Sequence, residues 1–149
     1  MMDGEFYRPG TGSRSSEGSV MDIIGLGTEI VECARVRAMI DEHGERFLNR
    51  IYTPEEVRWC QSRTNATEHF AAVWAAKEAV FKSLRVAGRG GSPWGQIEVE
   101  FKADSPRVKL RGALRERMTE AGVGNILLAT AYARHYATAT AVALRTGVG

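Results

Sequence analysis

The sequence predicts an α+β fold in which a long central helix packs against an antiparallel sheet. The first observation is an alanine-rich stretch beginning near residue 66, which contains no glycine or proline before Gly88 and is typical of a long helix. The second is the position of the strand-like segments, at the start of the folded part and in its second half. Helices separate these segments without regular strand–helix alternation, which excludes a parallel sheet built from βαβ units.

The first strand is predicted at residues 23–31, a segment rich in β-formers. Gly25 and Gly27 inside it indicate a place where another backbone comes close. Residues 32–43 carry apolar side chains at helical spacing and are followed by Gly44, so they predict a helix of about three turns. Residues 45–51 predict a further helical turn.

Two helix starts follow. The sequence Thr-Pro-Glu-Glu at 53–56 places a hydroxyl cap, a proline and two acids at the positive end of a helix dipole. Asn65 and Glu68 resemble a capping box that opens the long helix. With no interruption before Gly88, this helix is expected to run for about 20 residues, or roughly 30 Å. Its many alanines allow close packing, so we expect it to lie at the centre of the fold.

The remainder of the chain predicts a meander of antiparallel strands with one helix inserted, after a basic glycine-rich loop at 88–95. The expected strands are 97–101, 108–110, 126–132 and 136–144, and the expected helix is 113–121. The last two strands are expected to form a hairpin through residues 133–135.

Composition indicates an ordinary globular protein. Of the 149 residues, 44% are hydrophobic and 26% are charged, and the net charge of +2 is too small to imply nucleic-acid binding. No apolar run reaches the roughly 18 residues of a membrane span, and the three histidines lack the spacing of a zinc site. Cys33 and Cys60 are expected to be reduced thiols in a reducing cytoplasm.

The chain is expected to hold one folded domain, residues 21–146, behind a disordered tail. Residues 1–20 contain four glycines and four serines with scattered charges, and they lack the apolar core of a signal peptide.

Glu78 and Lys82 are the first candidates for chemistry. They are four residues apart in the predicted long helix, so their side chains share one face. A carboxylate for a divalent cation beside a base for phosphate suits pyrophosphate chemistry. The alternative is an ordinary solvated salt bridge within the helix.

Two ordered motifs stand out: residues 25–35 read GLGTEIVECAR, and residues 70–82 read FAAVWAAKEAVFK. The first resembles G-(I/L)-G-T-D-I-V-E-x-x-R, the opening motif of the holo-(acyl-carrier-protein) synthase family, the small 4′-phosphopantetheinyl transferases. The second resembles that family's F-A-x-R-(F/W)-A-A-K-E-A-x-x-K. Weaker matches are found at 94–99, 108–112 and 134–137, so the resemblance runs from about Met21 to Leu144.

The resemblance implies transfer of 4′-phosphopantetheine from coenzyme A to a serine of an acyl carrier protein. The partner then supplies the nucleophile, while the enzyme neutralises a pyrophosphate and orients the hydroxyl. Mg²⁺ suits this role because it combines few carboxylates with phosphate oxygens and water, although Mn²⁺ stays open. The resemblance also implies a homotrimer with its active sites between subunits. The carrier, for fatty acid or polyketide synthesis, is left open.

The same resemblance implies roles for particular residues. Glu29 and Glu78 occupy metal-ligand positions, and Glu78 and Lys82 are the catalytic candidates. Cofactor contacts are expected from Lys82, Lys77 and Arg89, with solvent exposure as the alternative for Lys77. Contacts with the acidic carrier protein are expected from Arg35, Arg46 and Arg50, each of which could instead be a solvated surface residue.

Some positions depart from the family pattern. Glu29 replaces an aspartate, which moves the carboxylate by roughly 1 Å, and such shifts can cost about a hundredfold in rate. Val73 replaces an arginine, residues 85–87 replace a glycine-rich Gly-Thr-Gly, and residues 131–132 replace a Ser-His pair. These departures leave two hypotheses: an active transferase with an altered site, or a catalytically impaired relative that binds carrier protein or coenzyme A without turnover.

Overall fold

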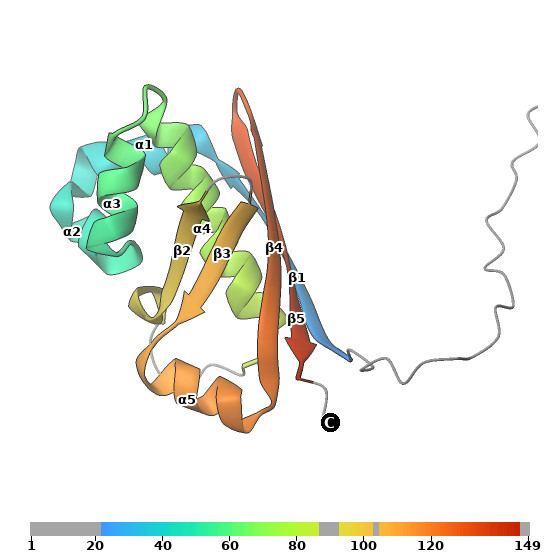
Figure 1. Ribbon diagram of the computed structural model, residues 1–149. Coiled ribbons are helices and arrows are strands. Elements are labelled where there is room, and N and C mark those ends of the chain that lie inside the picture. The colour runs from blue at the N-terminus through green and yellow to red at the C-terminus, as the bar shows by residue number, and fades with distance from the viewer. Residues whose placement is uncertain (1–21, 87–92, 103–104, 147–149) are drawn as a thin grey trace, which may run out of the picture.

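The computed structural model describes residues 22–86, 93–102 and 105–146, and its elements confirm the α+β prediction (Figure 1). The predicted tail, residues 1–20, lies outside the described residues. The elements are β1 (Ile23–Glu32), α1 (Cys33–His43), α2 (Glu45–Ile51), α3 (Pro54–Gln61), α4 (Ala66–Ser83), the short 3₁₀ helix η1 (Trp94–Gln96), β2 (Ile97–Lys102), β3 (Ser105–Leu110), α5 (Gly112–Glu120), β4 (Val123–Ala133) and β5 (Tyr136–Arg145).

Within the described residues the strands form two antiparallel sheets, so the predicted meander is divided between them, with the inserted helix in between. The larger sheet has the order β1-β5-β4, with the first strand paired to the last, and β2 pairs with β3 in a separate two-stranded sheet. Helix α5 lies between the two sheets along the chain. It begins at Gly112, which has a φ of 55° that glycine adopts readily. The predicted hairpin is confirmed, since Ala133 lies opposite Tyr136.

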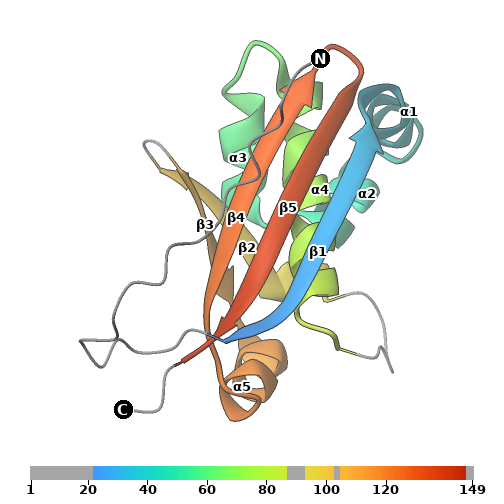
Figure 2. The same ribbon diagram turned by 90° about the vertical axis from the view of Figure 1, so that its right-hand side faces the viewer.

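Helix α4 packs lengthwise on one face of the larger sheet (Figures 1 and 2). Buried alanines of β5 pack against buried alanines of α4, and these small side chains bring the two backbones close. The tightest approach is at Gly25 and Gly27 of β1. A Cβ atom on Gly27 would lie 1.9 Å from the carbonyl oxygen of Ala79, and one on Gly25 would lie 2.2 Å from that of Ser83. The predicted close approach of a second backbone is therefore confirmed.

The N-terminal ends of α3 and α4 are capped differently. The start of α3 is a true capping box, in which Thr53 Oγ1 accepts from the Glu56 amide and Glu56 Oε2 accepts from the Thr53 amide. The capping box predicted at Asn65 is wrong, because the Asn65 amide group donates to the Tyr132 hydroxyl at 3.1 Å.

Helix α4 also ends earlier than predicted, at Ser83. Arg85 follows with a φ of 53°, a left-handed conformation that glycine adopts more readily. Arg85 stands at the first position of the Gly-Thr-Gly that the resembling family carries after this helix. Arg85 therefore forms this turn in place of a glycine, at a backbone strain of about 1 kcal/mol.

The outer face of the larger sheet is uncovered by the described residues, since the helices and the β2–β3 pair lie on the other face (Figures 1 and 2). Leu26 and Ile30 of β1 and Leu127 of β4 are 65%, 60% and 52% exposed on this sheet. Apolar side chains gathered on one face are typical of an interaction surface. None of the described helices combines the length and apolar character needed to cross a membrane.

Candidate functional site

Glu29 and Glu78 are brought together at the edge of the larger sheet. Side chains alternate along β1, so Glu29 points to the same side as Gly25 and Gly27, toward α4. There it meets Glu78, which lies one residue before Ala79, the point of closest approach. The two carboxylates line one cleft of about 290 Å³, together with Arg35 and Trp74. Residues far apart in the sequence thus converge because β1 and α4 are in backbone contact.

Lys82 contacts the acidic pair through Glu29, so its ion pair is with β1. Its Nζ atom is 2.9 Å from Glu29 Oε2 and donates to the Thr28 carbonyl at 3.1 Å. Within the described residues, the helix salt bridge between Glu78 and Lys82 that was the alternative interpretation is not formed. Lys82 is still about half exposed, so its ammonium can contact a bound anion.

The pKa values of the two carboxylates are shifted in opposite directions. Partial burial raises the pKa of Glu29, but hydrogen bonds from Lys82 and the Ile30 amide, with the charges of Lys82 and Arg35, outweigh burial and leave its pKa below the ordinary value. Partial burial raises the pKa of Glu78, and the negative charge of Glu29 raises it further. Burial and the Glu29 carboxylate thus outweigh the charge of Lys82, which lowers the pKa of Glu78, and a bound cation would favour the ionised form of Glu78.

This donor set fits Mg²⁺. A magnesium ion takes one or two protein carboxylates and leaves its other positions to water and phosphate oxygens. Glu29 and Glu78 supply two carboxylates beside an open cleft, and no group of three or more acidic, histidine or cysteine ligands occurs among the described residues. The arrangement therefore suits a cation shared with a phosphorylated ligand better than a closed structural metal site.

A second, larger cleft of about 470 Å³ adjoins the first at Arg35, Trp74 and Glu78. Its walls include Arg46 and Arg50, so all three arginines predicted to meet the carrier protein lie at the same cleft as Glu78. The Arg35 guanidinium is 5.8 Å from the ring centroid of Trp74, within cation–π range. Basic side chains of α1 and α2 therefore line the larger cleft together with Glu78.

Lys77 does not belong to this open site. Its side chain is completely buried, and its three N–H donors go to Glu56, the Ile51 carbonyl and the Trp94 carbonyl. The alternative of solvent exposure is wrong, and the ammonium has no free donor for coenzyme A, so we replace the cofactor role with a structural one. Arg89, also predicted to bind the cofactor, lies outside the described residues.

The departure at Val73 has a structural consequence, because this side chain is completely buried in the core. Where the resembling family carries an arginine, the chain therefore presents no charge. A polar contact of the family pattern is replaced by packing at this position.

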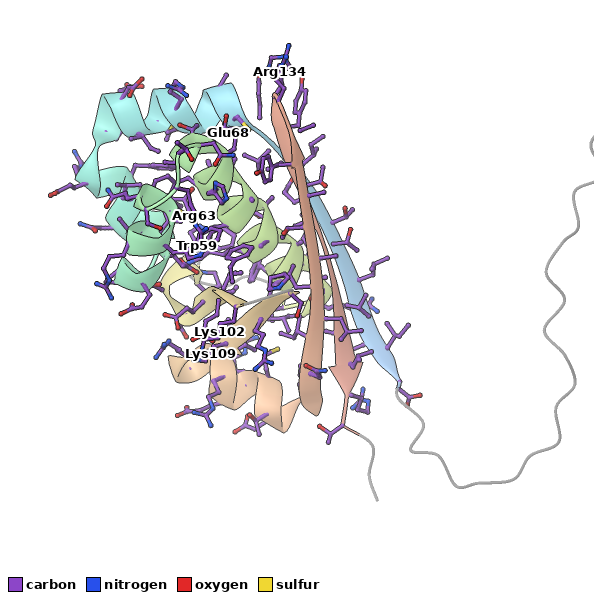
Figure 3. The ribbon with its side chains drawn as sticks, turned by 45° about the horizontal axis from the view of Figure 1, so that its top comes forward. Trp59, Arg63, Glu68, Lys102, Lys109 and Arg134 are labelled. Carbon is purple, nitrogen blue, oxygen red and sulfur yellow. The ribbon has the colours of Figure 1, made fainter. Side chains whose placement is uncertain are left out.

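Sequence reasoning missed an aromatic and basic cluster on the other side of α4. Trp59 stacks on Phe101 with ring centroids 4.2 Å apart, and Arg63 lies 4.8 Å from the Trp59 ring. Figure 3 shows Trp59 and Arg63 beside each other, with Lys102 and Lys109 below them. The cluster joins residues from separate elements, and no motif or spacing in the sequence connects them.

Comparisons with known proteins match almost the whole folded part. A family model described as the 4'-phosphopantetheinyl transferase superfamily matches residues 25–141. A holo-(acyl-carrier-protein) synthase of Rhodopirellula baltica is 43% identical over 123 residues, covering 82% of this chain and 98% of the relative. The crystal structure of the holo-(acyl-carrier-protein) synthase from Neisseria meningitidis matches with a TM-score of 0.75 and 28% identity, covering 82% of this chain and 98% of that one. A structure described as an ACPS-CoA complex from Chronobacterium ammoniagenes matches with a TM-score of 0.67 and 27% identity, covering 85% and 98%.

Proposed function

The chain belongs to the 4'-phosphopantetheinyl transferase superfamily, and from this premise we propose that it transfers 4′-phosphopantetheine from coenzyme A to a serine hydroxyl of an acyl carrier protein. The P–O bond within the pyrophosphate of coenzyme A breaks, the serine oxygen forms the new P–O bond, and adenosine 3′,5′-bisphosphate leaves. The observation that carries the proposal is the convergence of Glu29 and Glu78 at one cleft, with the Lys82 ammonium 2.9 Å from Glu29 Oε2. The R. baltica relative supports the proposal, because it is named a holo-(acyl-carrier-protein) synthase and the match covers nearly its full length.

We assign the binding of Mg²⁺ to Glu29 and Glu78. The ion would neutralise negative charge on the pyrophosphate. Lys82 already holds its ammonium beside Glu29, and we propose that it also donates hydrogen bonds to phosphate oxygens. Trp74 lines both clefts and would exclude water from the reacting phosphate. The chain thus acts through positioning and charge, while the nucleophile comes from the partner.

The carrier protein is proposed to approach over the larger cleft. Arg35, Arg46 and Arg50 are exposed and surround Glu78 on that side. An acidic partner would be steered there by charge complementarity, which raises the association rate and weakens with added salt. The serine hydroxyl would then arrive next to the acidic pair.

The experiment that tests the function is incubation of the protein with coenzyme A, Mg²⁺ and several apo-carrier proteins. We expect the mass of one phosphopantetheinyl group to be added to at least one carrier, and the addition to stop when a chelator removes the metal. If no carrier is modified while coenzyme A still binds, the chain is the catalytically impaired relative. The two departures that would favour this outcome are Glu29 and Val73.

We further propose that the chain forms a homotrimer through the outer face of its larger sheet. Family resemblance and the exposed Leu26, Ile30 and Leu127 support this. The two clefts are open to solvent on one domain, and an isolated domain cannot easily enclose a ligand as large as coenzyme A, which favours a site completed by a neighbouring subunit.

Light scattering is expected to give the mass of a trimer at working concentration. Ile30→Glu is expected to shift the protein to monomer, because the interface would bury the new carboxylate, whereas in the monomer it stays in water. Exposed Glu116 on α5 offers a control, since Glu116→Gln should leave the mass unchanged. A wild-type protein that is monomeric at every concentration would contradict this assembly.

A further inference from the structure

A buried ion pair lies directly behind the larger cleft. Lys77 Nζ and Glu56 Oε2 are 2.6 Å apart, and their side chains are 0% and 1% exposed. Such a pair is weak evidence for stability, because removing two charges from water costs about as much as their attraction returns. A purely apolar pair could fill the same space, so the specific hydrogen bonds of the two side chains require another explanation.

Those hydrogen bonds attach the cleft wall to α4. Lys77 Nζ donates to the carbonyl of Ile51 at 2.7 Å and to that of Trp94 at 2.9 Å. Ile51 is the last residue of α2, Trp94 is the first of η1, and both line the cleft that contains Glu78. Lys77 directly precedes Glu78 in α4. Its two hydrogen bonds therefore fix both wall segments to the part of α4 that carries Glu78.

Glu56 extends the same connection to two further segments. Its Oε2 atom accepts from the Thr53 amide, and its Oε1 atom accepts from the Val99 amide, each at 2.8 Å. The start of α3 and the strand β2 are thus held to α4 through one carboxylate. Next to the pair, the buried Glu98 is bonded to Arg111, so the two positive and two negative charges of this region are balanced.

We propose that Lys77 and Glu56 are positioning residues, which set the cleft walls at Ile51 and Trp94 at a fixed distance from Glu78. The expected loss of kcat rests on the proposed function, whereas the expected loosening of the cleft walls does not. The directed hydrogen bonds to Ile51 and Trp94, not the charge attraction itself, are what the site needs. This separates the proposal from a general role in stability.

The test compares Lys77→Met with the double variant Glu56→Gln/Lys77→Met. The single variant leaves a buried carboxylate without its cation, so it is expected to lower the melting temperature strongly. The double variant contains no unpaired buried charge and is expected to recover most of that loss. Its kcat for transfer should still be about a hundredfold below wild type, as for a misplacement of roughly 1 Å, while its KM for coenzyme A changes by less than about threefold.

Hydrogen exchange gives a readout that does not depend on the reaction. The Tyr52 amide shares its peptide group with the Ile51 carbonyl, and the Gln96 amide bonds to Pro93 beside Trp94. Both amides are expected to exchange at least about tenfold faster in the double variant. The neighbouring exposed residue supplies a matched control, since Glu55→Gln should change neither exchange nor kcat.

The outcomes are distinct. If the double variant recovers both melting temperature and kcat, or if its two amides exchange at the wild-type rate, the positioning role is refuted. If the wild-type protein itself modifies no carrier, the proposed function fails, and hydrogen exchange alone then decides the positioning role.

Discussion

Replacing Glu78 by glutamine is expected to lower kcat by at least about a hundredfold without lowering the melting temperature. The amide cannot supply the negative charge that holds a divalent cation, and one lost electrostatic contact in a transfer site typically costs 10² to 10³ in rate, or about 3–4 kcal/mol. The measurement is the initial rate of carrier modification by mass spectrometry at saturating Mg²⁺, alongside thermal unfolding.

The unchanged stability follows from the direction of the pKa shift. Burial and the charge of Glu29 raise the pKa of Glu78 in the folded protein. A carboxyl with a raised pKa destabilises the fold when it is ionised, so its contribution becomes unfavourable as pH rises above its unfolded value. At neutral pH the neutral amide therefore removes a repulsion. A variant that loses both activity and stability would show that Glu78 supports the fold, and one with wild-type turnover would reject the metal assignment.

A control for this experiment is Glu116→Gln, which neutralises an exposed carboxylate on α5. It should leave rate and melting temperature within experimental error of the wild type. Added salt should slow transfer by the wild type and by this variant equally, because Arg35, Arg46 and Arg50 stay in place.

Local chemistry made most of the fold predictable. Glycines at 25 and 27 indicated a close backbone approach, and the structure places the carbonyls of Ala79 and Ser83 there. The hydroxyl of Thr53 and the carboxylate of Glu56 predicted the start of α3, and both hydrogen bonds of the capping box are present. The sheet order was less accessible, because the pairing of β1 with β5 joins the two ends of the folded part.

The burial of Lys77 could have been predicted from spacing. Positions 70, 73, 77, 80 and 84 recur at intervals of three and four, and at four of them the residue is apolar. Lys77 occupies the middle of this buried face. Its partner Glu56 could not have been identified in this way, because only the folded chain brings α3 against α4.

Replacing Gly27 by alanine is expected to destabilise the protein by about 3 kcal/mol, the upper part of the range for overpacking. The added Cβ would lie 1.9 Å from a backbone carbonyl oxygen of α4, and a backbone cannot swing aside as a flexible side chain can. β1 must therefore move away from α4, which would lower the melting temperature by about 10 °C. Urea unfolding at neutral pH measures the change.

The same displacement reaches the acidic pair, because Glu29 is two residues beyond Gly27 on the same face of β1. At a temperature where the variant is still folded, we expect transfer to fall by about a hundredfold, as for a shift of roughly 1 Å. Gly95 offers the matched control, since a Cβ there would meet nothing within 4 Å, and Gly95→Ala should unfold within about 0.5 kcal/mol of wild type. Wild-type turnover by folded Gly27→Ala would mean that the contact between β1 and α4 does not determine the distance between Glu29 and Glu78.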